Sequence, residues 1–132
     1  MSATQSLSHI TAPISLGELV DKITILQIKT QQIHGKGLEN VRQELHVLVT
    51  ILDDLRFSID DEIISRLKNV NADLWQIEDD IREKERLKDF GESFIQLARS
   101  VYYHNDRRAA IKRELNVAYG SSLIEEKSYK EY

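Results

Sequence analysis

The chain contains no cysteine, one proline and five glycines in 132 residues, and aromatic residues make up only 7% of it. Without cysteine it has neither a disulfide framework nor thiolate metal ligands, and it gives no sign of an oxidising compartment. The shortage of glycine, proline and aromatic residues removes the usual components of β-turns and strands. Leucine, isoleucine, glutamate and lysine are abundant instead, so the composition predicts an all-α protein.

The sequence also lacks a long apolar run at its start and a strong excess of either charge. Residues 1–13 are polar and do not resemble a signal peptide or membrane anchor. The net charge of −4, from 18 basic and 22 acidic side chains, gives no overall field that would attract nucleic acid or anionic lipid. We therefore expect a cytoplasmic protein that binds neither nucleic acid nor membrane. A local basic stretch does occur at Arg99–Arg113.

Apolar residues recur at spacings of three and four in four segments, which predicts four amphipathic helices. Ser15 and Glu18 form a potential capping box at the start of the first helix, and Gly35 follows its end. The cap candidates Ser58 and Asp60 separate the second helix from the third. The predicted helices cover approximately residues 15–34, 38–59, 61–89 and 92–119.

Short connections favour antiparallel neighbours, so we expect an up-down bundle of about four helices at residues 14–120. A flexible tail precedes it at 1–13, and a tail or short helix follows at 121–132. The last two helices would be about 42 Å long against about 30 Å for the first two. Their overhang needs a cover, either the tail at 121–132 or a second copy of the chain. We therefore expect a homo-oligomer, most simply a dimer.

Several polar residues lie where the helical pattern requires apolar ones. Asn105, Arg108 and Lys112 fall on the apolar side of the last helix, and a buried arginine costs several kcal/mol unless it is paired. In a hairpin that turns near residue 90, Arg108 lies level with Asn71, and Asn105 lies level with Trp75. The candidate ligand-binding residues are Asn71, Trp75, Glu78, Arg82, Asn105, Arg108, Lys112 and Lys22.

This polar patch has two interpretations. In a structural network, Glu78 neutralises Arg108 or pairs with Arg82, and Trp75 simply packs. In a binding pocket, the arginines and Lys112 hold carboxylate or phosphate oxygens of a small anionic ligand, and Trp75 offers a stacking face. Lys22 lies with Glu18 on a strip of the first helix that forms either a solvated ion-pair ladder or a ligand-facing side.

The sequence carries no complete catalytic or metal-binding motif. There is no glycine-rich phosphate loop, nucleophile elbow or zinc-binding helix. A di-metal bundle would use Glu-x-x-His, but Gln43 and Val101 occupy the position three residues before His46 and His104. We therefore expect no metal and no cofactor, and assign no catalytic residue.

Several stretches together resemble an uncharacterised family of short all-helical proteins from bacteria and phages, a domain family of unknown function. The resemblance spans nearly the whole chain and implies no known activity, cofactor or ligand. Stretches typical of that family include Glu18, Lys22, Asn71, Trp75, Glu78, Asn105 and Arg108. The stretches that carry it are Pro13–Leu26, Val70–Asn71, Leu74–Trp75, Ile77–Asp79, Leu97–Tyr102, Asn105–Arg108 and Glu126–Tyr129.

Two functions fit these observations. The first is a small helical binding or interaction module with a polar groove between the third and fourth helices, whose partner is a protein or a small anionic ligand. The alternative is an enzyme that binds a small anionic substrate in a pocket lined by arginine and lysine. In such an enzyme Arg108, Lys112, Arg82 and Lys22 would hold the anion, and Glu78 or His104 would transfer any proton.

Overall fold

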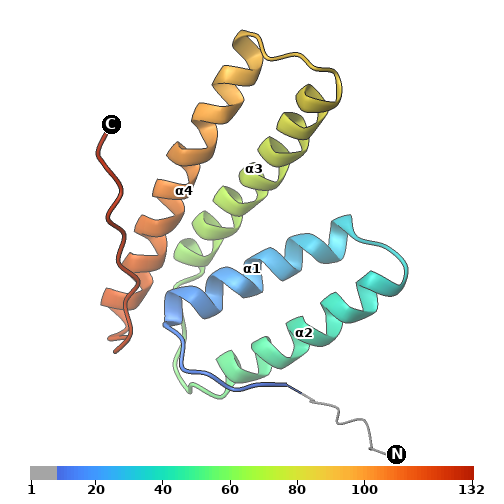
Figure 1. The fold of residues 1–132 in the computed structure, drawn as a ribbon. Coiled ribbons are helices and arrows are strands. Elements are labelled where there is room, and N and C mark those ends of the chain that lie inside the picture. The colour runs from blue at the N-terminus through green and yellow to red at the C-terminus, as the bar shows by residue number, and fades with distance from the viewer. Residues whose placement is uncertain (1–8) are drawn as a thin grey trace, which may run out of the picture.

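A computed structural model describes residues 9–132 of the chain (Figure 1). Among these residues there are four α-helices and no strand, which confirms the predicted all-α bundle. The third and fourth helices are the longest, with 26 and 27 residues, as predicted. No helix in this part of the chain is long and apolar enough to span a membrane. The helices are α1 (Leu16–Gln32), α2 (Lys36–Asp53), α3 (Asp61–Arg86) and α4 (Glu92–Ala118).

The helices form two hairpins that meet along α1 (Figure 1). Among the four helices, α1 packs against all three others, whereas α2 packs only against α1. The expected contact between successive helices therefore holds for α1 with α2 and for α3 with α4, but not for α2 with α3. The reason is the connection at residues 54–60, which has no helix and carries the chain past α1 to the far hairpin.

Short polar side chains begin two of the helices, as the sequence predicts. Ser15 Oγ accepts a hydrogen bond from the Glu18 amide at 3.1 Å, and Asp60 Oδ1 accepts one from the Glu62 amide at 2.9 Å. The Tyr119 hydroxyl accepts the Asp60 amide at 2.7 Å, which ties the end of α4 to the start of α3. The Glu18 carboxylate pairs with lysines, so the predicted capping box is only half formed.

The hydrophobic core lies where α1 crosses α3 and α4. Leu67 and Leu115 are completely buried there, and burying a leucine stabilises the fold by about 1.5–3 kcal/mol. α2 reaches this core only through the partly buried Leu52. The buried core residues are Leu16, Val20, Ile63, Leu67, Val70, Ile111 and Leu115.

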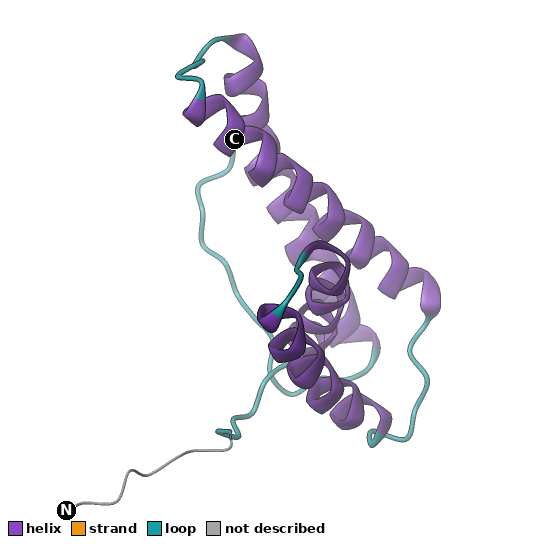
Figure 2. Ribbon diagram, turned by 90° about the vertical axis from the view of Figure 1, so that its right-hand side faces the viewer, coloured by secondary structure: helices purple, strands orange, loops and turns teal. Residues whose placement is uncertain are grey.

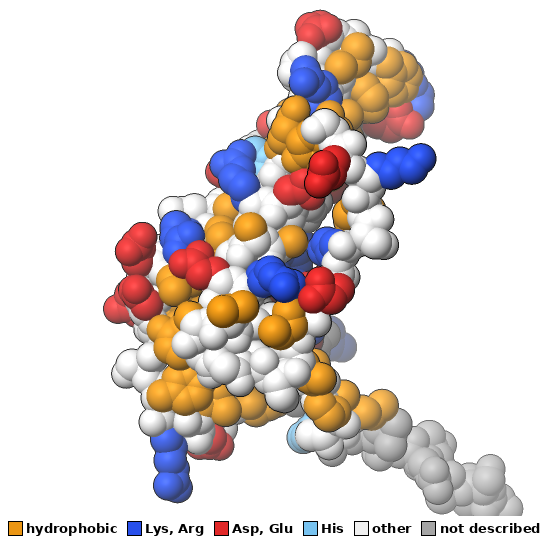
Figure 3. All heavy atoms as spheres, turned by 90° about the vertical axis from the view of Figure 1, so that its left-hand side faces the viewer, with side chains coloured by type: hydrophobic (Ala, Val, Ile, Leu, Met, Phe, Trp, Pro, Cys, Tyr) orange, Lys and Arg blue, Asp and Glu red, His pale blue; other side chains and the backbone are white. Residues whose placement is uncertain are grey.

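Residues 121–132 contain no helix and run back along α4 (Figures 1 and 2). The Tyr132 hydroxyl donates a hydrogen bond to Asp106, so this tail covers part of α4, one of the two predicted covers. The far end of the α3–α4 hairpin keeps exposed Leu87, Phe90 and Ile95. Figure 3 shows apolar side chains gathered at this end, above a surface where acidic and basic groups alternate.

Candidate functional site

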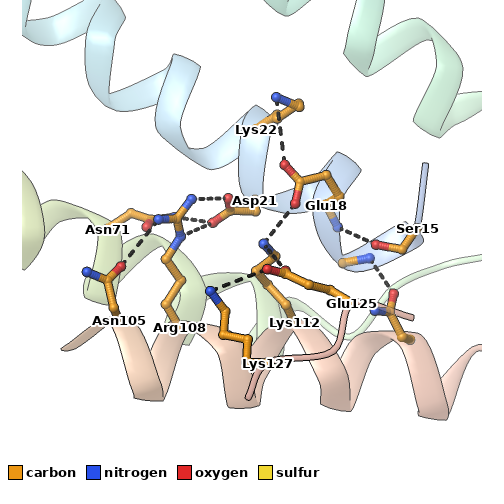
Figure 4. A network of polar contacts seen from close by, with 12 residues as sticks. Ser15, Glu18, Asp21, Lys22, Asn71, Asn105, Arg108, Lys112, Glu125 and Lys127 are labelled. Atoms are coloured by element: carbon orange, nitrogen blue, oxygen red, sulfur yellow. Dashed lines mark hydrogen bonds and ion pairs between the residues drawn. The ribbon is translucent and has the colours of Figure 1, made fainter. Parts of the chain in front are cut away.

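A row of polar contacts joins α1 to α4, and we call it the α1–α4 polar ladder. Its α4 members are Arg108, Lys112 and Asn116, which recur every four residues and therefore share one side of the helix. Its α1 members are Gly17, Glu18 and Asp21. Figure 4 shows most of these contacts at close range.

Asp21 and Arg108 form the central contact of the ladder (Figure 4). Arg108 Nε donates to Asp21 Oδ1 at 2.9 Å and its Nη2 donates to Oδ2 at 2.5 Å, which is a bidentate pair. Asp21 is fully buried, and Asn71 of α3 donates both to its Oδ1 and to Thr24 Oγ1 at 2.9 Å. The hydrogen bond to Asp21 raises the pKa of Arg108 above its ordinary value, although burial opposes this. Arg108 is therefore a fixed, paired cation.

Lys112 bridges two carboxylates (Figure 4). Its Nζ lies 2.8 Å from Glu18 Oε2 and 2.8 Å from Glu125 Oε2, and the residue is 7% exposed. Burial alone lowers the pKa of Lys112, but the hydrogen bonds to Glu125 and Glu18 outweigh burial and raise it. The hydrogen bond from Lys112 lowers the pKa of Glu125. Lys112 and Glu125 are therefore both charged at neutral pH.

The last contact of the ladder brings the backbones of α1 and α4 very close together. The Gly17 amide donates to Asn116 Oδ1 at 2.7 Å, and the Leu16 amide donates to Ser121 Oγ at 3.2 Å. A Cβ at Gly17 would lie 2.5 Å from the Lys112 carbonyl oxygen. Only glycine fits this position, and side chains from α4 and its following turn satisfy the first amides of α1.

Two hollows adjoin Arg108. The larger, which we call the Trp75 groove, is open, has a volume of about 490 Å³, and lies between α1, α3 and α4. Ile25, Leu74 and Trp75 are its apolar lining, and its polar lining is Asn71, Glu78, Asp79, Arg82, Asn105 and Arg108. The smaller, which we call the Lys112 hollow, has about 250 Å³ and is lined by Glu18, Asn105, Arg108, Ala109, Lys112, Glu125 and Lys127.

The structure brings together most of the candidate residues that the sequence predicts. Asn71, Trp75, Glu78, Arg82, Asn105 and Arg108 all line the Trp75 groove. Lys112 lies one helical turn further along α4, in the Lys112 hollow. Lys22 does not join either hollow, because its half-exposed side chain points away from Arg108 and lies 3.7 Å from Glu18 (Figure 4).

The ion pairs within the groove differ in part from the predicted network. Glu78 pairs with Arg82 at 3.7 Å, one of the two predicted arrangements, and Arg108 takes Asp21 instead of Glu78. His104 lies outside the groove lining, where its Nδ1 is 2.8 Å from the Ser100 carbonyl oxygen.

The sequence interpretation missed Asp21, the central residue of the ladder, and also Glu125 in the tail. A signal for Asp21 was present, because Leu19, Val20 and Ile23 surround it in the sequence and all are buried. A helix that is apolar around most of its circumference is covered by several neighbours, so a carboxylate within it needs a partner. No comparable pattern marks Glu125.

Within residues 9–132 no cluster of three or more histidine, cysteine, aspartate or glutamate side chains could hold a metal ion.

Residues 10–132 match DUF6165, a family of unknown function, and the chain belongs to this family. No curated protein and no solved structure matches the chain. Membership of this family assigns no activity to the chain.

Proposed function

We propose that this DUF6165 protein is a binding module that recognises its partner in the Trp75 groove, supported by the α1–α4 polar ladder. The observation that carries the proposal is that a paired Arg108 and an accessible Trp75 line the same groove. The Arg108 guanidinium is bound to buried Asp21, while the partly exposed Trp75 presents an aromatic surface within the same groove. A partly apolar groove with an aromatic side chain and a few polar groups is the usual composition of a binding site.

The charges favour a neutral or mixed polar partner over a dianionic substrate. Arg108 faces Asp21, and Arg82 lies 3.7 Å from Glu78. With Asp79 also in the lining, the groove has no surplus of positive charge. An anion that took Arg108 from Asp21 would leave a buried carboxylate without its partner, which is costly. An exposed segment of another protein, with an apolar or amide side chain against Trp75, satisfies this lining better.

The enzyme alternative receives less support from this geometry. It requires Arg108 as a substrate ligand, and this guanidinium already forms two hydrogen bonds with the buried Asp21 carboxylate. His104, the proposed proton carrier, does not line the groove. Retained turnover in an Arg108→Ala variant, in any reaction found for this protein, would remove the version in which Arg108 holds the substrate.

Trp75 is the sole tryptophan, which provides a direct test of the groove. We would screen small polar metabolites and short peptides by thermal shift, and follow hits by Trp75 fluorescence. A ligand at 100 times its Kd stabilises the folded state by about 2.7 kcal/mol, which is readily measured in a domain of this size. We expect a groove ligand to change the Trp75 emission of the wild type and to lose its thermal shift in Trp75→Ala.

Gln76→Ala provides the matched control, because Gln76 is the exposed neighbour of Trp75 and bonds only locally to Asp80. The Gln76→Ala variant should retain the full thermal shift that the ligand produces in the wild type. A ligand that stabilises Trp75→Ala as much as the wild type, or that leaves Trp75 emission unchanged, would contradict binding in this groove.

A dimer, a cytoplasmic location and a bacterial or phage origin stay predictions. The exposed Leu87, Phe90 and Ile95 at the end of the α3–α4 hairpin are the surface that we propose for the dimer. Light scattering after size exclusion tests it. A dimeric wild type and a monomeric Phe90→Asp variant would support this surface, and a monomeric wild type at high concentration would contradict it.

A further inference from the structure

The two carboxylates that hold Lys112 differ in how firmly they are fixed. Glu18 lies on α1, which the core and the polar ladder hold in place. Glu125 belongs to residues 121–132, which contain no helix. Its side chain is 40% exposed, whereas that of Lys112 is 9% exposed. Glu125 can therefore rotate into solvent, while Lys112 and Glu18 keep their positions.

Three cations surround the place that the Glu125 carboxylate occupies. Lys112 Nζ lies 2.8 Å from it and Lys127 Nζ lies 3.4 Å from it, and Arg108 lines the same hollow. The positive charge of Arg108 is itself favoured by the nearby Glu125. Two ammonium groups on one oxyanion, beside a guanidinium, are the usual arrangement for an external carboxylate or phosphate.

Other contacts hold the tail in place when the Glu125 side chain leaves. The Ser121 hydroxyl accepts the Leu16 amide and donates to the Leu123 carbonyl oxygen. Tyr132 bonds to Asp106 and packs against Tyr102. Lys127 can therefore stay beside Lys112 after the carboxylate has moved.

The charge of the hollow changes from neutral to positive when Glu125 moves out. With Glu125 in place, Arg108, Lys112 and Lys127 are balanced by Asp21, Glu18 and Glu125. Without the Glu125 carboxylate, three cations face two carboxylates, which leaves one unit of positive charge. The hollow has about 250 Å³ beside the Glu125 side chain, which is room for a single small oxyanion group.

We propose that the Lys112 hollow is a binding site for one oxyanion group, a carboxylate or a phosphate, and that the Glu125 side chain fills this site as an internal competitor until the ligand replaces it. Trp75 is not part of this lining, so the proposed anion site is separate from the Trp75 groove. A negative result for the anion site would leave the binding function proposed for the groove untouched.

Removing the internal competitor should unmask the site. We would titrate full-length Glu125→Gln with inorganic phosphate, and separately with acetate, by isothermal titration calorimetry. An attached competitor acts at an effective concentration in the millimolar range, so its removal should lower the apparent Kd by about tenfold or more relative to wild type. The tighter of the two anions identifies the oxyanion that the hollow prefers.

Glu126→Gln is the matched control, because it removes the same charge from the next residue, whose partner is the exposed Arg113. It should keep the wild-type Kd. In the Glu125→Gln background, Lys112→Met should abolish the gain in anion affinity, and Lys127→Gln should reduce this gain several-fold. Lys127 is exposed, so its replacement keeps the test valid if Lys112→Met fails to fold.

Three results would overturn the proposal. Equal tightening in Glu125→Gln and Glu126→Gln would show a general effect of net charge, and no tightening in Glu125→Gln would show that Glu125 does not occupy an anion site. Binding that is unchanged by the Lys127→Gln and Lys112→Met replacements would also place the anion elsewhere.

Discussion

The two sides of α1 are built differently. Toward α2 the contact is apolar, and within residues 9–132 no hydrogen bond or ion pair joins α1 to α2. Toward α4, Asp21 and Glu18 form ion pairs and Gly17 brings the backbones together. Apolar contacts tolerate sliding and repacking, whereas paired charges and a glycine contact permit one register. The comparison indicates that α2 is held by burial, and that the α1–α4 contact is fixed in position.

The largest effect should come from the centre of the polar side. Asp21→Ala leaves Arg108 partly buried without its carboxylate and removes an acceptor from Asn71. Breaking such a pair should lower the free energy of unfolding by about 3–5 kcal/mol, measured by urea denaturation.

Lys22→Ala, next in sequence and half-exposed, is the control for that variant and should cost no more than about 0.5 kcal/mol. A double-mutant cycle with Arg108→Met isolates the pair, because the two losses should be far from additive. A small loss in Asp21→Ala would show that the ladder does not hold α4.

A pair of glycine substitutions sharpens the comparison between the two sides. Gly17→Ala places a Cβ 2.5 Å from the Lys112 carbonyl oxygen and should destabilise the fold by about 1–3 kcal/mol. In Gly37→Ala the new Cβ meets only the Ile33 Cγ2 methyl, at 3.2 Å, and no backbone atom, and alanine is the better helix former. Gly37→Ala should therefore change stability by less than about 1 kcal/mol. Equal thermal denaturation of the two variants would refute the close backbone contact.

The apolar side should respond to loss of volume and not to salt. Leu48 of α2 is partly buried and lines the same mostly apolar hollow as Leu19 and Ile51. Leu48→Ala should cost about 1–2 kcal/mol because a half-buried leucine loses only part of its burial energy. The loss should be the same at low and high salt in urea denaturation. A loss that changes strongly with salt would reveal a charge contribution that the structure does not show at this contact.

The smallest effect concerns Glu125, where the polar side reaches the tail. Its hydrogen bond with Lys112 lowers the pKa of Glu125 below its ordinary value of 4.5. The ionised carboxylate therefore stabilises the folded state at neutral pH, and this contribution is lost as the pH falls through the lowered pKa. At pH 7 the free energy of unfolding of the wild type, measured by urea denaturation, should exceed that of Glu125→Gln by less than about 1 kcal/mol, because the pair is partly exposed. The difference should vanish below the lowered pKa. A constant difference from pH 7 to pH 3 would exclude the ionised pair.

The four helices and the meeting of Asn71, Trp75, Asn105 and Arg108 could be predicted from the sequence. The helical period fixes which side of each helix is apolar, and the turn near residue 90 sets which residues of α3 and α4 lie level. Local rules determine both features, so one sequence is sufficient to predict them.

The partner of Arg108 could not be predicted in the same way. Asp21 lies 87 residues from Arg108, and their contact depends on how α1 crosses the α3–α4 hairpin. That crossing follows from the packing of side chains such as Leu67 and Leu115 and from the Gly17 contact, not from the length of the connections. For the same reason the sequence did not predict that α2 and α3 would be out of contact, nor that Glu125 would reach Lys112.

Among the four helices, α2 packs only against α1, and this affects how the molecule opens. α2 can separate from the rest while the core of α1, α3 and α4 stays closed, because that core includes α2 only through partly buried Leu52. In native-state hydrogen exchange, the amides of α2 should therefore exchange through a partial opening of lower free energy than those around Leu67 and Leu115. Within the first hairpin, α2 would then move away while the ion pairs of Asp21 and Glu18 keep α1 against α4.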